Sequence, residues 1–325
     1  VGEAVLAGDK PTRRGAISAP LYDTPRAVST GPNWAYLRIA EGCDNRCAYC
    51  VIPSLRGKFR SRTKESILEE ARLLAASGVK ELIIVAQDIT RYGIDLYGKV
   101  CLTELLKELC KLDFCWVRLH YLYPELIDDE LIDEIASEDK IVKYLDIPIQ
   151  HINDTILRRM NRRGTGEEIR ALFKKLRERI PGLVLRTSLI TGLPGEGEAE
   201  FEELCDFLRE AKIERAGVFP YSPEEGTPAA LMPDRCSTEE AQRRAELCME
   251  IQAEIMDGFA ETFIGRELNV LVMGREPDGT PWGRSEYDSP DIDSRVIFSG
   301  GAAPGDMVRV RIDSVDDGEL IGEQI

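Results

Sequence analysis

The sequence predicts an α/β protein in which a partial (β/α)6 barrel of the TIM type is followed by a small all-β barrel. Three observations support this prediction. Strand-like apolar runs alternate with amphipathic helical runs between residues 34 and 235, which is typical of a parallel sheet. Hydrophobic residues form 43% of the chain and charged residues 31%, as in globular proteins. Beyond residue 262, short β-like runs are broken by Gly, Pro and Asp and show no helical period.

Six apolar runs are predicted to form the strands of the sheet, and amphipathic segments to form the helices between them. The strands are predicted at residues 34–40, 80–87, 115–122, 142–150, 183–190 and 216–222. The helices are predicted at residues 63–78, 102–109, 128–137, 166–182 and 198–211. The first helix has apolar residues at Ile67, Leu68, Ala71 and Leu74, at amphipathic spacing, and is expected to end at Gly78. A doubly wound open sheet would give a similar pattern, so this alternative stays open.

The same patterns divide the chain into four parts. Residues 1–32 are predicted to be a linker or the remnant of a preceding domain, and 33–235 the α/β core. A connecting helix is expected at 236–261, within the helical run 237–265, and the β barrel at 262–325. No apolar run has the length of a membrane span, and no secretory signal is seen. We therefore expect a cytoplasmic protein, whose nine cysteines indicate metal binding or catalysis before disulfides.

The charge of the chain limits its partners. The formal net charge is −16 and the pI about 4.8, so binding to a nucleic-acid backbone is unexpected and a basic partner is favoured. Residues 262–325 hold thirteen acidic residues against six arginines, a net charge of −7. This acidity suits a protein rich in lysine and arginine better than RNA. An acidic surface that only maintains solubility is the alternative.

Three cysteines stand close together in "AEGCDNRCAYCVIP", where Cys43, Cys47 and Cys50 form a C-x3-C-x2-C pattern directly after the first predicted strand. The carboxyl ends of barrel strands are where active sites lie. A closed zinc site would need a fourth ligand, which His120 or His151 could supply only by folding back. An iron–sulfur cube held by three thiolates instead leaves its fourth iron free to bind a substrate.

The spacing favours the cube, because C-x3-C-x2-C with an aromatic residue before the last Cys is typical of radical S-adenosylmethionine (SAM) enzymes. In those enzymes the open iron binds SAM, and an electron from the cluster breaks a carbon–sulfur bond. The 5′-deoxyadenosyl radical that is released then abstracts a hydrogen atom from an unactivated carbon. The six other cysteines are interpreted as small buried apolar residues.

Longer motifs extend this likeness along residues 34–325. The segments "GCDNRCAYCVIPSLRGKFRSR", "AQDITRYGIDLYG", "YLDIPIQHINDTILRRMNRRGT", "LRTSLITGLPGE" and "YSPEEGTPAA" resemble the methylthiotransferase branch of the radical SAM superfamily. The terminal barrel resembles the TRAM domain of that branch. The details "IPSLRG", "RLHYLYP", "DIPIQH" and "MNRRGT" resemble the members that methylthiolate the β-carbon of an aspartate in a small-subunit ribosomal protein. They are less similar to the members that modify an adenosine in tRNA.

The resemblance implies cofactors and partners. Cys43, Cys47 and Cys50 would hold a 4Fe-4S cluster with one open iron, and two SAM molecules would be consumed, one for its methyl group and one for the radical. An electron donor protein is implied, as is a basic ribosomal protein bound through the acidic barrel. Members of the branch carry a second 4Fe-4S cluster in a preceding domain, but no cysteine precedes Cys43 here. We therefore expect this chain to cleave SAM without completing sulfur insertion.

The resemblance also implies SAM contacts near the cysteines. Tyr49 would pack near the adenine, although a hydrophobic plug is the simpler interpretation. Gln87 and Asp88, at the end of the second predicted strand, stand where the superfamily presents polar groups to the SAM amino group. Gln150, at the end of the fourth predicted strand, is expected at the ribose or the methionyl group.

Two further contacts are expected from later strands. Arg186 could pair with the SAM carboxylate, because a guanidinium fits that geometry, or it could form a buried ion pair. The turn at Gly192–Glu196, "GLPGE", could offer backbone groups to adenine, or it could simply lead into a helix.

The remaining basic and histidine residues are interpreted more simply. The run 158–163, "RRMNRRG", is interpreted as a solvated helix face rather than a polyanion contact. The run 56–62 is expected to line the mouth of the active site. His120 and His151 are interpreted as structural residues at strand ends, although His151 could face the substrate cavity. Three functions stay open: an aspartyl methylthiotransferase, a tRNA adenosine methylthiotransferase, and a zinc-stapled, non-enzymatic ribosome-binding module.

Overall fold

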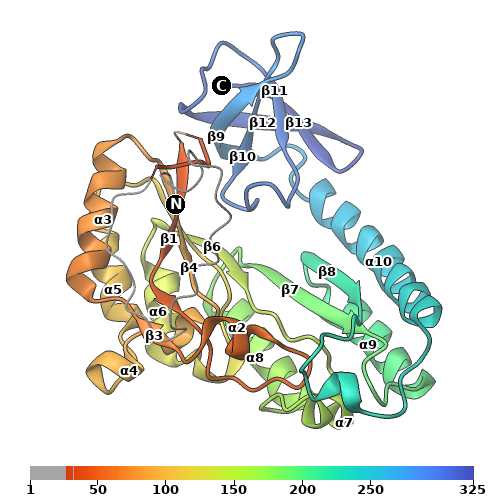
Figure 1. Ribbon diagram of the computed structural model, residues 1–325. Coiled ribbons are helices and arrows are strands. Elements are labelled where there is room, and N and C mark those ends of the chain that lie inside the picture. Colours follow the sequence, from red (N-terminus) through yellow and green to blue (C-terminus); the bar gives the residue numbers. More distant parts are fainter. Residues whose placement is uncertain (1–26, 32) are drawn as a thin grey trace, which may run out of the picture.

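A curved parallel sheet forms the centre of the computed structural model, which describes residues 27–31 and 33–325 (Figure 1). Most of the linker predicted at 1–32 therefore lies outside the described residues. The strands are β1 (Trp34–Arg38), β4 (Glu81–Val85), β5 (Trp116–Leu119), β6 (Ile141–Asp146), β7 (Val184–Thr191) and β8 (Arg215–Pro220). They pair in the order β1-β4-β5-β6-β7-β8, and every pair is parallel. A doubly wound sheet reverses its strand order, and this sheet does not. The predicted partial barrel is confirmed.

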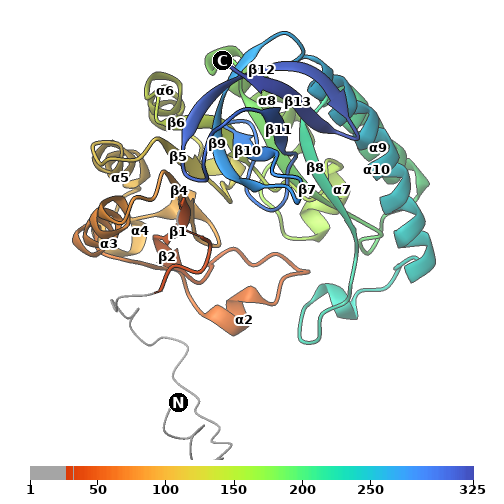
Figure 2. The same ribbon diagram turned by 90° about the horizontal axis from the view of Figure 1, so that it is seen from above.

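Helices cover the convex face of the sheet (Figure 2). The predicted helices form α3 (Lys64–Ala76), α5 (Leu102–Leu109), α6 (Asp129–Ser137), α8 (Gly166–Arg179) and α9 (Glu198–Ala211). Shorter elements fill the connections: α2 (Ile52–Arg56), α4 (Ile94–Tyr97), α7 (Asp154–Arg159), the 3₁₀ turns η1 (Ile89–Arg91), η2 (Pro124–Leu126) and η3 (Ala229–Leu231), and the strand pair β2 (Ala40–Glu41) and β3 (Arg60–Ser61). Of the four apolar residues predicted for this helix, α3 buries Ile67, Ala71 and Leu74, and Leu68 is partly buried against the same core.

A long helix, α10 (Thr238–Glu261), packs on α9 and β8 and leads into the second domain. Its start is capped by the Ser237 side chain, which accepts a hydrogen bond from the Glu240 N–H at 3.1 Å. The second domain is a closed barrel of β9 (Glu267–Arg275), β10 (Pro281–Ser285), β11 (Val296–Ser299), β12 (Met307–Asp316) and β13 (Glu319–Gln324). Its core includes Val270, Phe298 and Ile312, so the predicted small β barrel is confirmed. No described helix is long and apolar enough to cross a membrane.

The terminal barrel sits at the amino ends of the sheet strands, and α2 lies at the opposite end (Figure 1). A segment that we call the barrel loop (residues 285–294) reaches the concave face of the sheet. Tyr144 on β6 lies 2.7 Å from Asp293, and Arg215 on β8 lies 2.8 Å from Asp288. Their sequence neighbours Leu145 and Ala216 pack in the core between the sheet and the helices. Because successive side chains of a strand point to opposite faces, Tyr144 and Arg215 point to the concave face of the sheet. The barrel loop thus closes the amino end of the partial barrel.

Candidate active site

The three-cysteine loop follows β2 at the carboxyl edge of the sheet, as the sequence predicted. Gly42 begins this loop with φ 85°, a conformation that favours glycine. A Cβ at this position would lie 2.2 Å from the Lys58 carbonyl oxygen, so only glycine fits the close approach of the two segments. The Gly42 N–H donates to Gln87 Oε1 at 2.6 Å. The loop is thereby tied to the end of β4.

Two acidic side chains support the loop from within. Asp44 accepts a hydrogen bond from the Phe59 N–H at 3.1 Å, which joins the loop to the segment after α2. Asp88 is buried and accepts a hydrogen bond from the Asn45 side chain at 3.0 Å. Burial raises the pKa of Asp88 above its usual value, although its hydrogen bonds with Thr90 and Asn45 act against the rise. Asp88 therefore holds the cysteine loop in place from beneath it.

The far side of the loop rests on the end of α7. The Ala48 N–H donates to the Met160 carbonyl at 2.8 Å, and the Asn161 side chain donates to the Arg46 carbonyl at 2.6 Å. Asn161 has φ 54°, a conformation that asparagine tolerates better than most residues. The loop is thus fixed on both sides by elements that the sequence separates widely.

A cavity of about 440 Å³ opens at this edge, within the size range of small-molecule sites. All three cysteines line it, together with three of the predicted SAM contacts, Tyr49, Gln87 and Gln150. Sequence reasoning missed further residues of its wall, namely Asn45, Tyr121, Tyr123, Arg162 and Ser188. Asn45 lies in the cysteine loop, Tyr121 and Tyr123 follow β5, Arg162 follows α7, and Ser188 lies on β7. The wall is therefore built mainly from the segments that follow the strands at the carboxyl edge of the sheet.

The three thiols were predicted to hold an iron–sulfur cube rather than a zinc ion. Within residues 27–31 and 33–325, no group of three or more His, Cys, Asp and Glu side chains is placed to hold one metal ion. A cube instead takes each thiolate at a different iron. Burial raises the pKa of Cys43 to about 11 and also raises that of Cys50. Thiolates here therefore need a nearby positive charge, which bound iron provides.

Three predicted contacts do not line the cavity. Asp88 lies beneath the loop, as described above. Arg186 Nη1 lies 2.9 Å from Asp146 Oδ1, so the structure has the buried ion pair that was the alternative interpretation. Gly192 lies against α10, because a Cβ on it would lie 2.4 Å from Ala241 Cβ. Contacts between SAM and any of the residues predicted to bind it stay a prediction.

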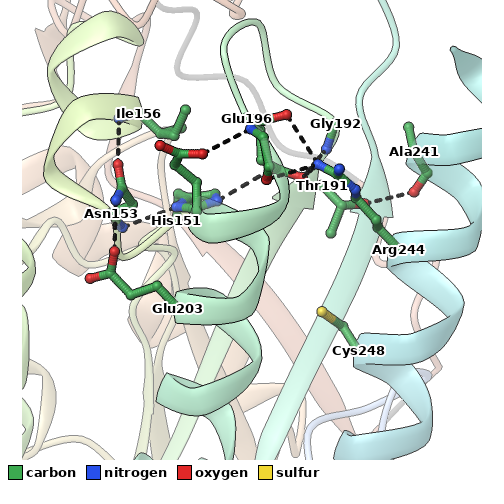
Figure 3. Close-up of polar contacts among 12 residues, drawn as sticks. His151, Asn153, Ile156, Thr191, Gly192, Glu196, Glu203, Ala241, Arg244 and Cys248 are labelled. Atoms are coloured by element: carbon green, nitrogen blue, oxygen red, sulfur yellow. Dashed lines mark hydrogen bonds and ion pairs between the residues drawn. The ribbon is translucent and has the colours of Figure 1, made fainter. Parts of the chain in front are cut away.

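The turn at Gly192–Glu196 belongs to a buried polar network (Figure 3). The Gly192 N–H donates to Glu196 Oε1 at 2.9 Å, and Arg244 of α10 donates to the same oxygen at 2.9 Å. His151 Nε2 lies 3.3 Å from Glu196 Oε2, and His151 Nδ1 accepts a hydrogen bond from the Asn153 N–H. His151 thus links the start of α7 to the turn and is not among the cavity residues. The Gly192 N–H is therefore already used within this network.

The basic run 158–163 is only partly a solvated face. Arg158 and Arg163 are exposed, as that interpretation expects. Arg162 is instead half-buried in the cavity wall, where its guanidinium lies over the Tyr123 ring at 4.3 Å. The interpretation was wrong for this residue because the helix ends at Arg159, so Arg162 does not continue its surface period. The motif "MNRRGT" marked the segment, but no periodicity could select Arg162 from its neighbours.

Comparison with known proteins agrees with this geometry. Residues 37–208 match the family model of the radical SAM superfamily, and residues 264–325 match the TRAM domain. Proteins named ribosomal protein uS12 methylthiotransferase RimO are among the relatives. The one from Pelotomaculum thermopropionicum is 52% identical over 306 residues, covering 93% of this chain and 69% of its own length. The one from Caldanaerobacter subterraneus is 49% identical over 302 residues, covering 92% and 69%.

Solved structures share the fold at much lower identity. Coproporphyrinogen III oxidase HemN from Escherichia coli, described as a radical SAM enzyme, aligns with a TM-score of 0.52 at 20% identity, over 69% of this chain and 52% of its own. The radical SAM methyltransferase TsrM from Kitasatospora setae aligns with a TM-score of 0.51 at 20% identity, over 60% and 38%. These likenesses concern the fold alone.

Proposed function

The chain belongs to the radical SAM superfamily and, within it, to the RimO methylthiotransferases, and we propose that it adds a methylthio group to the β-carbon of an aspartate in ribosomal protein uS12. The observation that carries this proposal is the cysteine loop, whose three thiols line one cavity at the carboxyl edge of the sheet. The identity of about 50% to RimO proteins over nine-tenths of the chain supports the substrate.

The residues of the site would share the work as follows. Cys43, Cys47 and Cys50 would hold a 4Fe-4S cluster, which supplies the electron that cleaves SAM. Tyr49 and Tyr123 present large, half-buried aromatic surfaces to the cavity and would help to exclude water around the reacting atoms. Gln150 presents its side chain from a strained backbone position with φ 72°. We assign it to the ribose or methionyl group of SAM.

Several finer parts of the function are also proposals. A second 4Fe-4S cluster, outside residues 1–325, would take part in sulfur donation, so this chain by itself would cleave SAM without inserting sulfur. An external protein would supply the electrons, and the reaction would take place in the cytoplasm. The acidic barrel would attract the basic ribosomal protein by its net charge of −7.

The test has two arms that do not depend on the sulfur donor. Anaerobically reconstituted protein, with dithionite and SAM, is expected to release 5′-deoxyadenosine, and the Cys47→Ala variant is expected to release none. With uS12 deuterated at the aspartate β-carbon, deuterium should appear in 5′-deoxyadenosine. Transfer from deuterated adenosine in tRNA, and not from uS12, would contradict the substrate proposal. A colourless protein that binds zinc and no iron would contradict the enzyme proposal.

A further inference from the structure

The side chains of Arg162 and Tyr123 both contact Cys47, the middle cysteine of the loop. Arg162 Nη1 lies 4.0 Å from Cys47 Sγ, and the Tyr123 hydroxyl lies 3.5 Å from the same sulfur. The Arg162 guanidinium is also stacked over the Tyr123 ring at 4.3 Å. Cys47 is buried, whereas Cys43 and Cys50 are half-buried. The three cysteines are therefore not equivalent: Cys47 has the Arg162 guanidinium and the Tyr123 hydroxyl beside it, and the Tyr49 hydroxyl also interacts with it.

Arg162 is held in this position by backbone contacts. Its Nη2 donates to the Pro148 carbonyl at 2.6 Å, and its own N–H donates to the Leu157 carbonyl at 2.8 Å. No carboxylate forms an ion pair with Arg162 in the part of the chain that the structure describes. A half-buried guanidinium without a carboxylate partner is costly unless another negative group compensates it. The sulfur of Cys47, once it is a metal-bound thiolate, is such a group.

Donors beside a cluster sulfur change how readily the cluster accepts an electron. One-electron reduction makes the cluster and its thiolates more negative by one unit. A guanidinium and a hydroxyl hydrogen beside one sulfur stabilise that extra charge, and the half-buried position limits screening by water. Hydrogen bonds to the sulfurs and solvent exposure are known determinants of cluster potential.

We propose that Arg162 and Tyr123 are positioning residues that act through Cys47 to raise the reduction potential of the cluster, so that an external one-electron donor can reduce it. This inference rests on the proposed function, because it presumes the cluster. The contacts assign the two residues separate parts: Arg162 supplies the charge, and Tyr123 supplies a second donor and the surface on which the guanidinium lies.

The experiment measures the midpoint potential of the reconstituted cluster by an anaerobic titration monitored by electron paramagnetic resonance, without any substrate protein. Arg162→Met keeps an unbranched apolar side chain at this position and removes the guanidinium with its charge. We expect the equilibrium constant for reduction to fall at least tenfold, which is about 60 mV for one electron. Arg162→Lys keeps the charge and should change the constant less than threefold. Arg163→Met is the matched control, because Arg163 is the exposed neighbour outside the cavity, and it should give the parent value.

Tyr123→Phe provides a second test in case Arg162→Met does not assemble a cluster. It keeps the ring under the guanidinium and removes the hydroxyl, and it should lower the reduction constant about threefold. The affinity for SAM, measured on the same samples, separates the proposal from a simple carboxylate-binding role for Arg162. Weaker SAM binding in Arg162→Met with an unchanged potential would overturn the proposal, as would unchanged potentials throughout. A parent protein without a four-iron cluster would overturn the proposed function itself.

Discussion

His120 makes the stability of the fold depend on pH below the ordinary pKa of histidine, 6.5. It is buried at the end of β5, where its ring stacks on Tyr144 and its Nε2 lies 3.1 Å from the Ser289 hydroxyl of the barrel loop. Burial, reinforced by the charges of Arg118 and Arg186, lowers the pKa of His120 from 6.5 to about 3. Between about pH 3 and pH 6.5, the imidazole is therefore neutral in the folded protein and protonated in the unfolded chain.

The size of the effect follows from this shift. Because the pKa is lower in the folded state, the stabilisation is fully present above pH 6.5 and decreases as the pH falls toward 3. The loss approaches about 1.4 kcal/mol per pH unit, and between pH 7.5 and pH 5.0 it amounts to about 2 kcal/mol. Burial raises the pKa of Asp146 and of Asp288, and these carboxyls act in the opposite direction. The difference between variant and parent isolates the histidine.

The assay is urea unfolding at several pH values between 5.0 and 7.5, followed by tryptophan fluorescence. His120→Gln should be destabilised at pH 7.5 but should lose about 2 kcal/mol less than the parent on acidification. Ser289→Ala removes the hydrogen-bond partner and leaves the burial, so it should be offset from the parent at all pH values without a change of slope. A His120→Gln variant with the same slope as the parent would refute the reasoning.

Three further predictions concern one buried ion pair and two backbone positions that hold the cysteine loop. Glu81 is fully buried between Arg118 and Arg284, so Glu81→Gln should lower the free energy of unfolding by about 3–5 kcal/mol in urea, because it leaves buried arginines without a counter-charge. Gly42→Ala should abolish iron binding, measured by iron content after reconstitution. Gly78→Ala, with a similar φ of 91° but nothing near its Cβ, should bind iron normally and cost about 1 kcal/mol. Asn161→Ala should release iron to a chelator several-fold faster than Asn161→Gly, because alanine is strained at φ 54°.

The fold could be predicted because its signals are local. The apolar strand runs and the helical periods reflect which side chains are buried against the sheet. All six strands of the sheet and the five helices between them were predicted from these patterns. Of the short α7, only the last two residues lay in a run that was interpreted as helical, 158–163, since six residues give too few turns to show a period. The contact of the barrel loop with Tyr144 and Arg215 joins positions more than seventy residues apart, and no sequence pattern records such a pairing.

The site could be predicted in part for a similar reason. The spacing of Cys43, Cys47 and Cys50 is set by one loop, so it can be recognised in the sequence alone. Gln87 and Gln150 follow from the rule that strand ends meet at one edge. Arg186 and Arg162 show the limit of that reasoning. Arg186 was expected to bind SAM, but it pairs with Asp146. Arg162 was expected to be solvated, but its guanidinium lies beside Cys47. The partner of a charged side chain is decided by tertiary contacts.

The position of the terminal barrel limits how its acidity can act on a basic substrate. The barrel lies at the amino end of the sheet, whereas the cysteine loop lies at the carboxyl end (Figure 1). Asp288 and Asp293 are already paired with Arg215, so they offer no charge to a partner. Exposed charges are largely screened beyond about 8 Å at physiological salt. The remaining acidic residues would therefore attract the ribosomal protein during approach, and the residues around the cavity would position the aspartate. Substitutions in the exposed acidic set should accordingly change the rate of association and its dependence on salt more than the rate of hydrogen abstraction.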